Sequence, residues 1–221
     1  ERKVIRLNKV SKYFDSTPAL EDVSLEISTG EQVVIQGPSG GGKSTLLRLI
    51  AGLETPTQGE IYLGEQLASS PESISPPHTR NIGFVFQRSA LWQHMTVAQN
   101  IHFAMRNLSK SEEGARLSKL LEEMELTSFI SRYPSQLSGG EARRVAIARA
   151  LAAEPKILLM DEALTSLNPE LKEHILALIQ KFVRQKEITL LYVTHLTEEA
   201  QQIPGRKIYI QKGKIVQNDP Q

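Results

Sequence analysis

The sequence predicts an α/β protein whose core is a mainly parallel sheet. Strand-like and helix-like segments alternate through the last third of the chain, which is the pattern of strands joined by helical crossovers. One of these segments, residues 157–160 (ILLM), is apolar throughout, as expected of a strand buried on both faces. Short β-branched runs in the first third predict further strands, and the fold that we expect adds an antiparallel β subdomain to the parallel core.

Composition excludes several classes of protein. The 221 residues carry 26 Lys and Arg against 25 Asp and Glu, and this net charge of +1 gives no bulk attraction to nucleic acid. The absence of cysteine excludes a disulfide scaffold, a thiolate zinc site and a cysteine nucleophile. No apolar run is long enough for a membrane span or a signal peptide. Because the chain begins with Glu1 rather than Met, we expect it to have been trimmed.

Five runs predict the strands of the first third. Gly30 and Glu31 predict a turn between the second and third runs, and the Ser- and Pro-rich stretch 69–78 predicts a surface loop. The runs are Val4–Leu7, Val23–Ile27, Gln32–Ile35, Ile61–Leu63 and Ile82–Phe86.

Apolar residues at helical spacing predict helices in the middle of the chain. They occupy Val97–Met105, with Thr96 as the N-cap, and Leu117–Met124. We therefore expect one domain over residues 1–221, in which a helical subdomain, 89–153, is inserted between two parts of the core, 1–88 and 154–221. The last third predicts a helix over Leu171–Phe182, a buried strand over Ile188–Val193, a short acidic helix near Glu198 and a hairpin formed by Lys207–Ile210 and Lys214–Val216.

Residues 37–45 (GPSGGGKST) match the pattern G-x-x-x-x-G-K-S/T, which predicts a P-loop NTPase core. Glycines let backbone N–H groups turn toward phosphates, and the helix predicted over Lys43–Ala51 directs its positive end at the same anion. A ligand-free glycine turn is the alternative, and the strand before the loop with the helix after it disfavours that alternative. The expected nucleotide contacts are Gly37, Pro38, Ser39, Gly40, Gly41, Gly42, Lys43, Ser44 and Thr45, with Lys43 reaching the β- and γ-phosphates and Ser44 binding Mg²⁺.

Two acidic residues follow the buried strand 157–160. We expect Asp161 to hold Mg²⁺ through water and Glu162 to polarise the attacking water. The alternative is a helix N-terminus, whose first turn favours acids. The P-loop in the same chain favours the catalytic interpretation.

A second predicted phosphate-binding device lies at residues 137–141 (LSGGE), before a helix predicted over Ala142–Ala153. Ser138 can exchange a hydrogen bond with a phosphate, and Gly139 and Gly140 leave amides exposed at a helix N-terminus. One γ-phosphate needs only one cradle. We therefore expect two chains to meet face to face, each supplying one device to the other's nucleotide.

These motifs, in this order, resemble the nucleotide-binding subunit of an ATP-binding cassette (ABC) transporter over roughly residues 4–217, most closely the bacterial importer ATPase subunits. Segment 137–141 resembles the family signature LSGGQ, which implies that Ser138, Gly139, Gly140 and Glu141 contact nucleotide. The resemblance also implies that Gln87 is the Q-loop glutamine, which contacts Mg²⁺, and that His195 is the switch histidine, which contacts the γ-phosphate. It implies that Phe14 stacks on adenine, with Tyr13 as the alternative. Taken singly, each would be a structural residue; their order and spacing favour function.

Two departures from the family pattern fall after the acidic pair. Asn168 stands where the family's D-loop usually has Asp, within the segment Thr165-Ser166-Leu167-Asn168, and Ala163 replaces a common Pro. The resemblance implies altered communication between the two sites of a dimer. Neither departure removes a catalytic group.

The resemblance implies an ATPase, converting ATP and water to ADP and phosphate with Mg²⁺. The implied catalytic residues are Lys43, Gln87, Glu162 and His195, and the implied metal ligands are Ser44, Gln87 and Asp161. ATP-driven dimerisation would be coupled to transport, with import of a small solute favoured. An exporter, a lipoprotein- or division-type cassette and a soluble non-transport ABC ATPase are the alternatives. Gln87 and Ser138 are too close in sequence for the long insertions of repair-type members.

The implied partners are a second nucleotide-binding subunit, identical or paralogous, and integral membrane permease subunits; a solute-binding protein is a further candidate, and nucleic acid is not expected. The permease would dock at Gln87–Met95, where Leu91, Trp92 and Met95 suit either an interface or core packing. The resemblance places the chain in the cytoplasm, on the cytoplasmic face of the inner membrane. Because no regulatory domain follows before residue 221, we expect an amino-acid-type or trimmed member.

Overall fold

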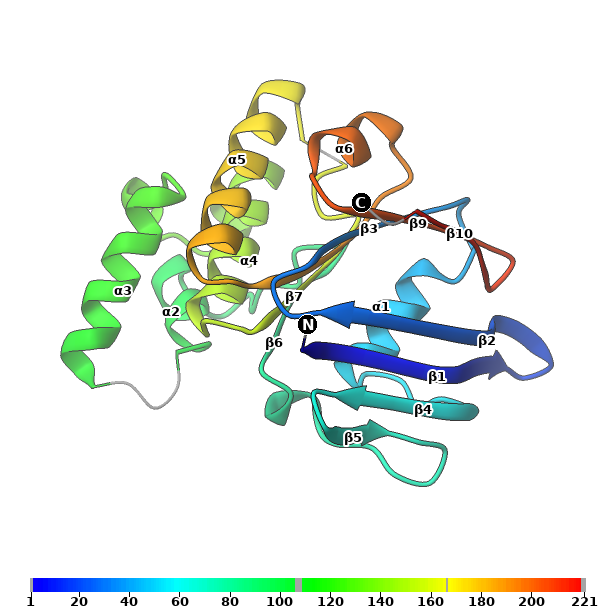
Figure 1. Ribbon diagram of the computed structural model, residues 1–221. Coiled ribbons are helices and arrows are strands. Elements are labelled where there is room, and N and C mark those ends of the chain that lie inside the picture. Colours follow the sequence, from blue (N-terminus) through cyan, green and yellow to red (C-terminus); the bar gives the residue numbers. More distant parts are fainter. Residues whose placement is uncertain (1, 106–108, 166, 220–221) are drawn as a thin grey trace.

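The computed structural model describes residues 2–105, 109–165 and 167–219, which form two sheets with helices between and beside them (Figure 1). Ser166 of the predicted D-loop lies outside these residues. The smaller sheet is antiparallel, in the order β2-β1-β4-β5. Its strands are β1 (Lys3–Phe14), β2 (Thr17–Ser28), β4 (Gln58–Leu63) and β5 (Gln66–Ser69).

The larger sheet has the order β10-β9-β3-β8-β7-β6, and all of its strand pairs are parallel except β9 with β10. The predicted α/β class, with a mainly parallel sheet and an antiparallel β subdomain, is therefore confirmed. The strands are β3 (Gln32–Gln36), β6 (Ile82–Val85), β7 (Ile157–Asp161), β8 (Thr189–Val193), β9 (Arg206–Gln211) and β10 (Lys214–Asp219).

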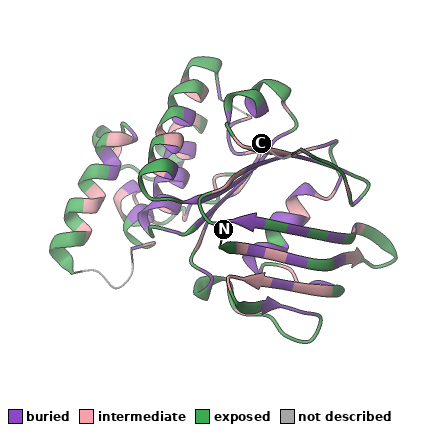
Figure 2. Cartoon of the chain, viewed as in Figure 1, coloured by how far each residue is buried: buried purple, intermediate pink, exposed green. Residues whose placement is uncertain are grey.

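Side chains alternate between two hydrophobic cores along the central strands. Leu159 and Leu191 face α1 (Lys43–Ala51), which lies between the two sheets, whereas Leu158 and Leu190 face the other helices. Because both faces are covered, every residue of β7 and β8 is buried, and the two strands appear purple in Figure 2. The remaining helices are α2 (Val97–His102), α3 (Lys110–Glu123), α4 (Gly139–Ala152), α5 (Pro169–Gln185) and α6 (Thr197–Gln202).

The antiparallel sheet extends beyond its prediction. Strand β1 continues to Phe14 through a bulged, partly exposed stretch, in which Lys9 has a φ of 47°. Strand β5 was not predicted, and its last residue, Ser69, begins the predicted loop 69–78. That loop also holds a single 3₁₀ turn, Pro77–Thr79, which ends one residue beyond it. These segments carry little apolar alternation, so the sequence pattern alone does not mark them.

Capping residues set the helix starts. Thr96 caps α2 as predicted, accepting a hydrogen bond from the Gln99 N–H. Helix α4 begins at Gly139 rather than at the predicted Ala142, because Ser138 and Glu141 form a capping box around its first turn.

Helices α2, α3 and α4 share one hydrophobic core with α5 and one face of the large sheet. The division of the chain at residues 89 and 153 stays a prediction. Within the described residues, no helix is both long enough and apolar enough to cross a membrane.

Candidate nucleotide-binding site

The P-loop joins β3 to α1, and close backbone contacts require glycine at two of its positions, Gly37 and Gly42. Gly37 has a φ of 145°, and a Cβ there would lie 1.9 Å from the Ile210 carbonyl oxygen of β9. Gly42 has a φ of 105°, and a Cβ there would lie 2.4 Å from the Ala19 carbonyl oxygen. Gly42 is also the N-cap of α1 and offers no side-chain acceptor. The first-turn N–H groups of α1 are therefore left for a ligand.

Lys43 is buried beneath this loop. Its Nζ donates hydrogen bonds to the carbonyl oxygens of Gly37, at 2.9 Å, and Pro38, at 2.8 Å. The same ammonium lies 4.0 Å from Oε1 of Glu162. The charge is thus held at the centre of the loop, where phosphate groups are expected.

Asp161 and Glu162 leave the carboxyl end of β7 toward the P-loop. Asp161 Oδ1 accepts a hydrogen bond from Ser44 Oγ at 2.9 Å. Burial raises the pKa of the Asp161 carboxyl and the charge of Glu162 adds to this, while the Ser44 hydrogen bond opposes it. Glu162 has a φ of 46°, and its N–H donates to the Val193 carbonyl of β8 at 3.0 Å. This backbone contact holds the strained residue beside the neighbouring strand.

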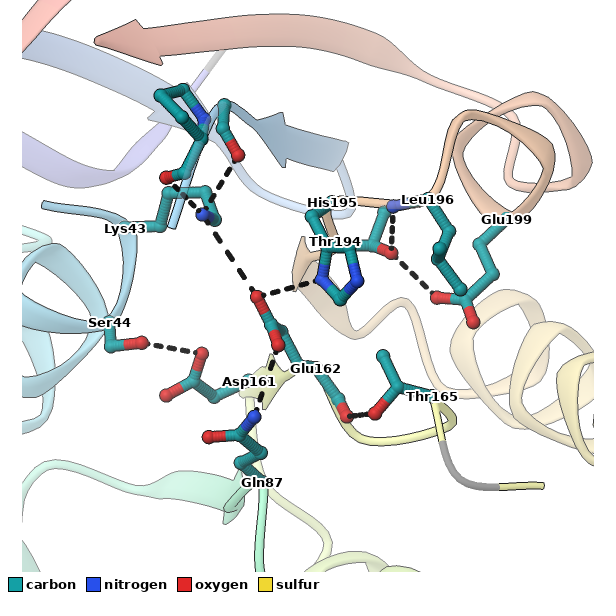
Figure 3. Close-up of polar contacts among 12 residues, drawn as sticks. Lys43, Ser44, Gln87, Asp161, Glu162, Thr165, Thr194, His195, Leu196 and Glu199 are labelled. Atoms are coloured by element: carbon teal, nitrogen blue, oxygen red, sulfur yellow. Dashed lines mark hydrogen bonds and ion pairs between the residues drawn. The ribbon is translucent and has the colours of Figure 1, made fainter. Parts of the chain in front are cut away.

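The Glu162 carboxylate is contacted by side chains from several elements (Figure 3). Its Oε1 lies 3.1 Å from Nδ1 of His195, which follows β8. Its Oε2 accepts a hydrogen bond from Nε2 of Gln87 at 3.1 Å. Residues from three strand ends therefore converge on one carboxylate, as expected at the carboxyl edge of a parallel sheet.

A pocket of about 290 Å³ lies at this convergence. Most of the predicted P-loop contacts line it together with Gln87 and Glu162. Ala19 also lines it, which the sequence did not indicate. The lining residues are Ala19, Ser39, Gly40, Gly41, Gly42, Lys43, Ser44, Thr45, Gln87 and Glu162.

The oxygen atoms at this pocket fit Mg²⁺. Ser44 and Gln87, which line it, offer a hydroxyl and an amide, and Asp161, which accepts a hydrogen bond from Ser44, offers a carboxylate; these are hard ligands. No group of three or more His, Cys, Asp or Glu side chains suited to a metal occurs in the part of the chain that the structure describes. A magnesium ion here would draw its other ligands from phosphate oxygens and water.

Comparison with known proteins decides the family. The sequence profile of the ABC transporter family matches residues 20–165. The chain belongs to the ABC transporter family. It is 45% identical over 219 residues to the sulfate/thiosulfate import ATP-binding protein CysA 1 of Agrobacterium fabrum (strain C58), covering 96% of this chain and 62% of that protein. It is 44% identical over 215 residues to CysA of Thermosynechococcus vestitus (strain BP-1), covering 96% and 63%.

This ABC chain thus spans less than two thirds of the length of these curated relatives. Its fold matches two solved dimers of the cassette MJ0796 at 35% identity, each covering 98% of both chains. One is described as a bacterial ABC transporter cassette (TM-score 0.89), and the other as a post-hydrolysis state bound to ADP and Pi (TM-score 0.87). A third match is cbiO1 from Clostridium perfringens, at 26% identity and a TM-score of 0.86, covering 99% of this chain and 88% of that one.

Some predicted site residues do not line the pocket but bond residues that do; these are Gly37, Pro38, Asp161 and His195. Two other predicted parts of the ABC site have no such contact within the described chain. The Phe14 ring is exposed at the end of β1, with the Lys12 ammonium 5.0 Å from its centroid; Tyr13 is half-buried. Segment 138–141 contributes no residue to the pocket lining. Adenine stacking by Phe14 and nucleotide contact by the signature stay predictions.

Sequence reasoning missed two buried arginines that brace this ABC fold. Arg143 of α4 donates to the carbonyl oxygens of Phe86, at 2.6 Å, and Gln87, and so ties the signature helix to the Q-loop. Arg80 donates to the carbonyls of Leu49 and Ile50 at the end of α1. Arg143 carried a signal, since the mainly apolar run VAIARAL follows Arg143 and Arg144 in the same helix, but its backbone partners are not visible in sequence.

Proposed function

We propose that this chain is the ATP-hydrolysing subunit of a membrane transporter that imports a small solute. The convergence of Lys43, Gln87 and His195 on Glu162 beside the P-loop carries the proposal. Relatives named as import ATP-binding proteins favour import over an exporter, a division-type cassette or a soluble ABC ATPase. Because those relatives are named for sulfate and thiosulfate, sulfate is the first solute to test.

In the proposed reaction, positioning and electrostatics supply the catalysis. The loop amides from Gly37 to Thr45 and the Lys43 ammonium hold the phosphates. Mg²⁺, held by Ser44 and Gln87 with Asp161 reached through water, would neutralise charge on the β- and γ-phosphate oxygens. Each of these side chains faces the same pocket or bonds a residue that lines it.

Glu162 then orients and polarises the attacking water. Its carboxylate already accepts from Gln87 and faces His195, so water entering between them meets an acceptor at a fixed position. The His195 ring is exposed on its other side and can turn to donate to the γ-phosphate. General-base help of this kind is worth roughly 10²–10⁴-fold in rate.

The second chain of a dimer, identical or paralogous, would complete the site. Ser138, Gly139, Gly140 and Glu141 lie exposed or half-buried at the N-terminus of α4, away from the pocket of their own chain. The dimeric MJ0796 structures support this arrangement. ATP would then hold the dimer together and hydrolysis would release it.

The permease is proposed to dock beside the Q-loop. A hollow of about 660 Å³ there is lined by β6, α4 and the aromatic pair Trp92 and Phe103, whose centroids are 4.4 Å apart. Phe84 and Phe86 stack at 4.2 Å on the same hollow. Leu91 is buried in the core, so of the predicted docking residues Trp92 suits the interface best.

This assembly would place the chain on the cytoplasmic face of the cell membrane, with a solute-binding protein as a candidate partner on the other side and no nucleic acid.

The test is a pull-down of tagged Glu162→Gln with Mg-ATP from host membranes solubilised in mild detergent. Lys43→Ala is the matched control, because it weakens ATP binding. Nucleotide-dependent recovery of a polytopic membrane protein is the expected outcome. Recovery of soluble partners alone, with ATPase activity in the parent, would contradict transport and leave the ATPase proposal standing.

A further inference from the structure

Glu199 is a buried carboxylate that the proposed mechanism does not use. It lies on α6, and its residue is 1% exposed. Its Oε2 accepts hydrogen bonds from the hydroxyls of Tyr192, at 2.9 Å, and Thr194, at 2.7 Å. Its Oε1 forms an ion pair with the Lys172 ammonium at 2.6 Å. A buried carboxylate is costly unless it is paired and hydrogen-bonded, so these partners account for its presence.

The first two partners belong to the segment that carries His195. Tyr192 lies in β8, and Thr194 directly follows that strand. The Thr194 Oγ1 also accepts from the Leu196 N–H at 3.0 Å, so this hydroxyl closes a turn around His195 (Figure 3). Burial and the Glu199 charge raise the pKa of Tyr192 far above its usual range, which keeps its hydroxyl a donor.

The third partner belongs to the segment that follows Glu162. Lys172 lies in the first turns of α5, only ten residues further along the chain, and its N–H donates to the Asn168 carbonyl. Thr165, between them, donates its hydroxyl to the Glu162 carbonyl at 3.0 Å. One carboxylate therefore bonds the segments that leave two neighbouring strands, β7 and β8.

Helix α6 is itself anchored to the sheet. Lys207 of β9 donates from Nζ to the carbonyl oxygens of Ala200, which is next to Glu199, and Ile203, which follows the last residue of the helix. Glu199 is thus presented from a helix that the large sheet holds in place. A side chain on such a helix keeps a fixed position, so it can hold the loops that it contacts in place rather than move with them.

We propose that Glu199 is a positioning residue that sets the placement of His195 relative to Glu162. The proposal rests on the hydrolysis proposed above. Glu199 holds the His195 turn through Thr194 and the segment after Glu162 through Lys172. Without the ion pair the two segments lose their common anchor, and the 3.1 Å contact between His195 and Glu162 loosens. A displacement of about 1 Å at a reacting centre can cost on the order of 10²-fold in rate.

The test compares Glu199→Gln and Lys172→Met with a matched control, Glu123→Gln. Glu123 also pairs with a lysine, Lys181, at 3.1 Å, but on α3, away from the site. We expect Glu199→Gln to lower kcat about tenfold or more, with the Kd for a fluorescent ATP analogue unchanged. The double variant Glu199→Gln/Lys172→Met should recover thermal stability, since no buried charge is left unpaired, without recovering kcat.

A second readout needs no activity. The chain has 5 His residues, so the His195 ring signals can be assigned by NMR with a His195→Ala variant. Glu199→Gln should shift these signals, and Glu123→Gln should leave them in place. Unchanged His195 signals in folded Glu199→Gln or, if that variant does not fold, in Lys172→Met would overturn the proposal. So would a lower melting temperature with parental kcat at low temperature. An inactive parent whose His195 signals still shift would refute the proposed hydrolysis and leave the positioning contact standing.

Discussion

The P-loop and the signature segment both place glycines before a helix, yet they are built differently. At the P-loop, α1 starts from Gly42 in a left-handed conformation, with no side-chain cap and no acidic residue in its first turn. At the signature, α4 starts from Ser138 in an extended conformation, and Ser138 and Glu141 cap the helix reciprocally. The N-terminal donors of α1 are unoccupied by the chain itself, whereas those of α4 are partly satisfied.

This difference indicates an order of binding. We expect the P-loop to hold phosphates alone, because the N-terminal N–H groups of α1 have no side-chain cap and its positive helix end has no acidic residue in the first turn. The signature must share or exchange hydrogen bonds within its own capping box. Its contribution is therefore expected to be weak until a second chain presents a nucleotide that is already bound.

The largest expected effect separates the two glycine segments directly. Gly37→Ala would drive a Cβ into the Ile210 carbonyl, and both groups are backbone, so neither can move cheaply. We expect loss of nucleotide binding by more than about 100-fold or failure to fold. Gly139→Ala is the matched change, because nothing lies within 4 Å of its added Cβ. Fluorescent ATP titration of the monomer should show parental affinity for Gly139→Ala; equal losses in both variants would contradict the comparison.

Arg143 tests whether the two regions are tied together. Arg143→Met leaves the carbonyls of Phe86 and Gln87 without their buried donor. We expect unfolding in urea to show a loss of about 1–3 kcal/mol, with a lower kcat because the Q-loop carbonyls are released. Arg132→Met is the control. Arg132 is exposed, and its guanidinium lies over the Phe129 ring, 4.7 Å from the centroid, so we expect this substitution to cost less than about 0.5 kcal/mol of unfolding free energy.

Ser138 sharpens the capping argument. Ser138→Ala removes the acceptor for the Glu141 N–H and is expected to destabilise the chain by about 1 kcal/mol. Ser138→Asp keeps a cap but would place a carboxylate where the partner's phosphate is proposed to bind. If the signature acts on the partner's nucleotide, both variants lose ATPase activity while the monomer binds ATP normally. Parental ATPase activity in Ser138→Asp would remove the signature from the site.

The smallest expected effect comes from a charge remote from both regions. The Glu154 pKa is lowered, first by its hydrogen bond from Lys186 and then by Arg116. The pKa of Glu154 is lower in the folded chain than in the unfolded chain, where it is about 4.3. Glu154 therefore contributes its whole stabilisation of the fold above the unfolded pKa, and this contribution is lost as pH falls through the folded pKa. Glu154→Gln should cost under about 1 kcal/mol at pH 7, since the pair is exposed. The urea midpoints of the two proteins should approach each other as pH falls below the unfolded pKa.

The prediction from sequence succeeded where local pattern decides structure. Helix α1 begins and ends at the predicted Lys43 and Ala51, and β7 and β8 lie on the predicted apolar runs. The motif residues Lys43 and Glu162 do lie together. Strand β5 was missed because a short edge strand with polar residues has little periodicity.

Residues whose partners are distant in sequence were also missed. Arg143 donates to carbonyls more than 50 residues away, and Arg80 to carbonyls about 30 residues away. The sequence places Glu199 only in a short acidic helix, because its role depends on Lys172 and on the hydroxyls of Tyr192 and Thr194. A single sequence reveals which polar side chains are unusual among their apolar neighbours, but not which backbone group or side chain forms a hydrogen bond or ion pair with them.

The position of β3 between β8 and β9 has a consequence for synthesis of the chain. The ribosome makes β3 and the P-loop more than 150 residues before both neighbours of β3. Pairings so distant in sequence are slow to form. The carbonyl that Gly37 rests against, at Ile210, belongs to the last stretch of the described chain. A chain that has not yet been made as far as β9 therefore has the predicted phosphate-binding residues but not their folded arrangement, and we expect ATP to bind only after β9 has been synthesised.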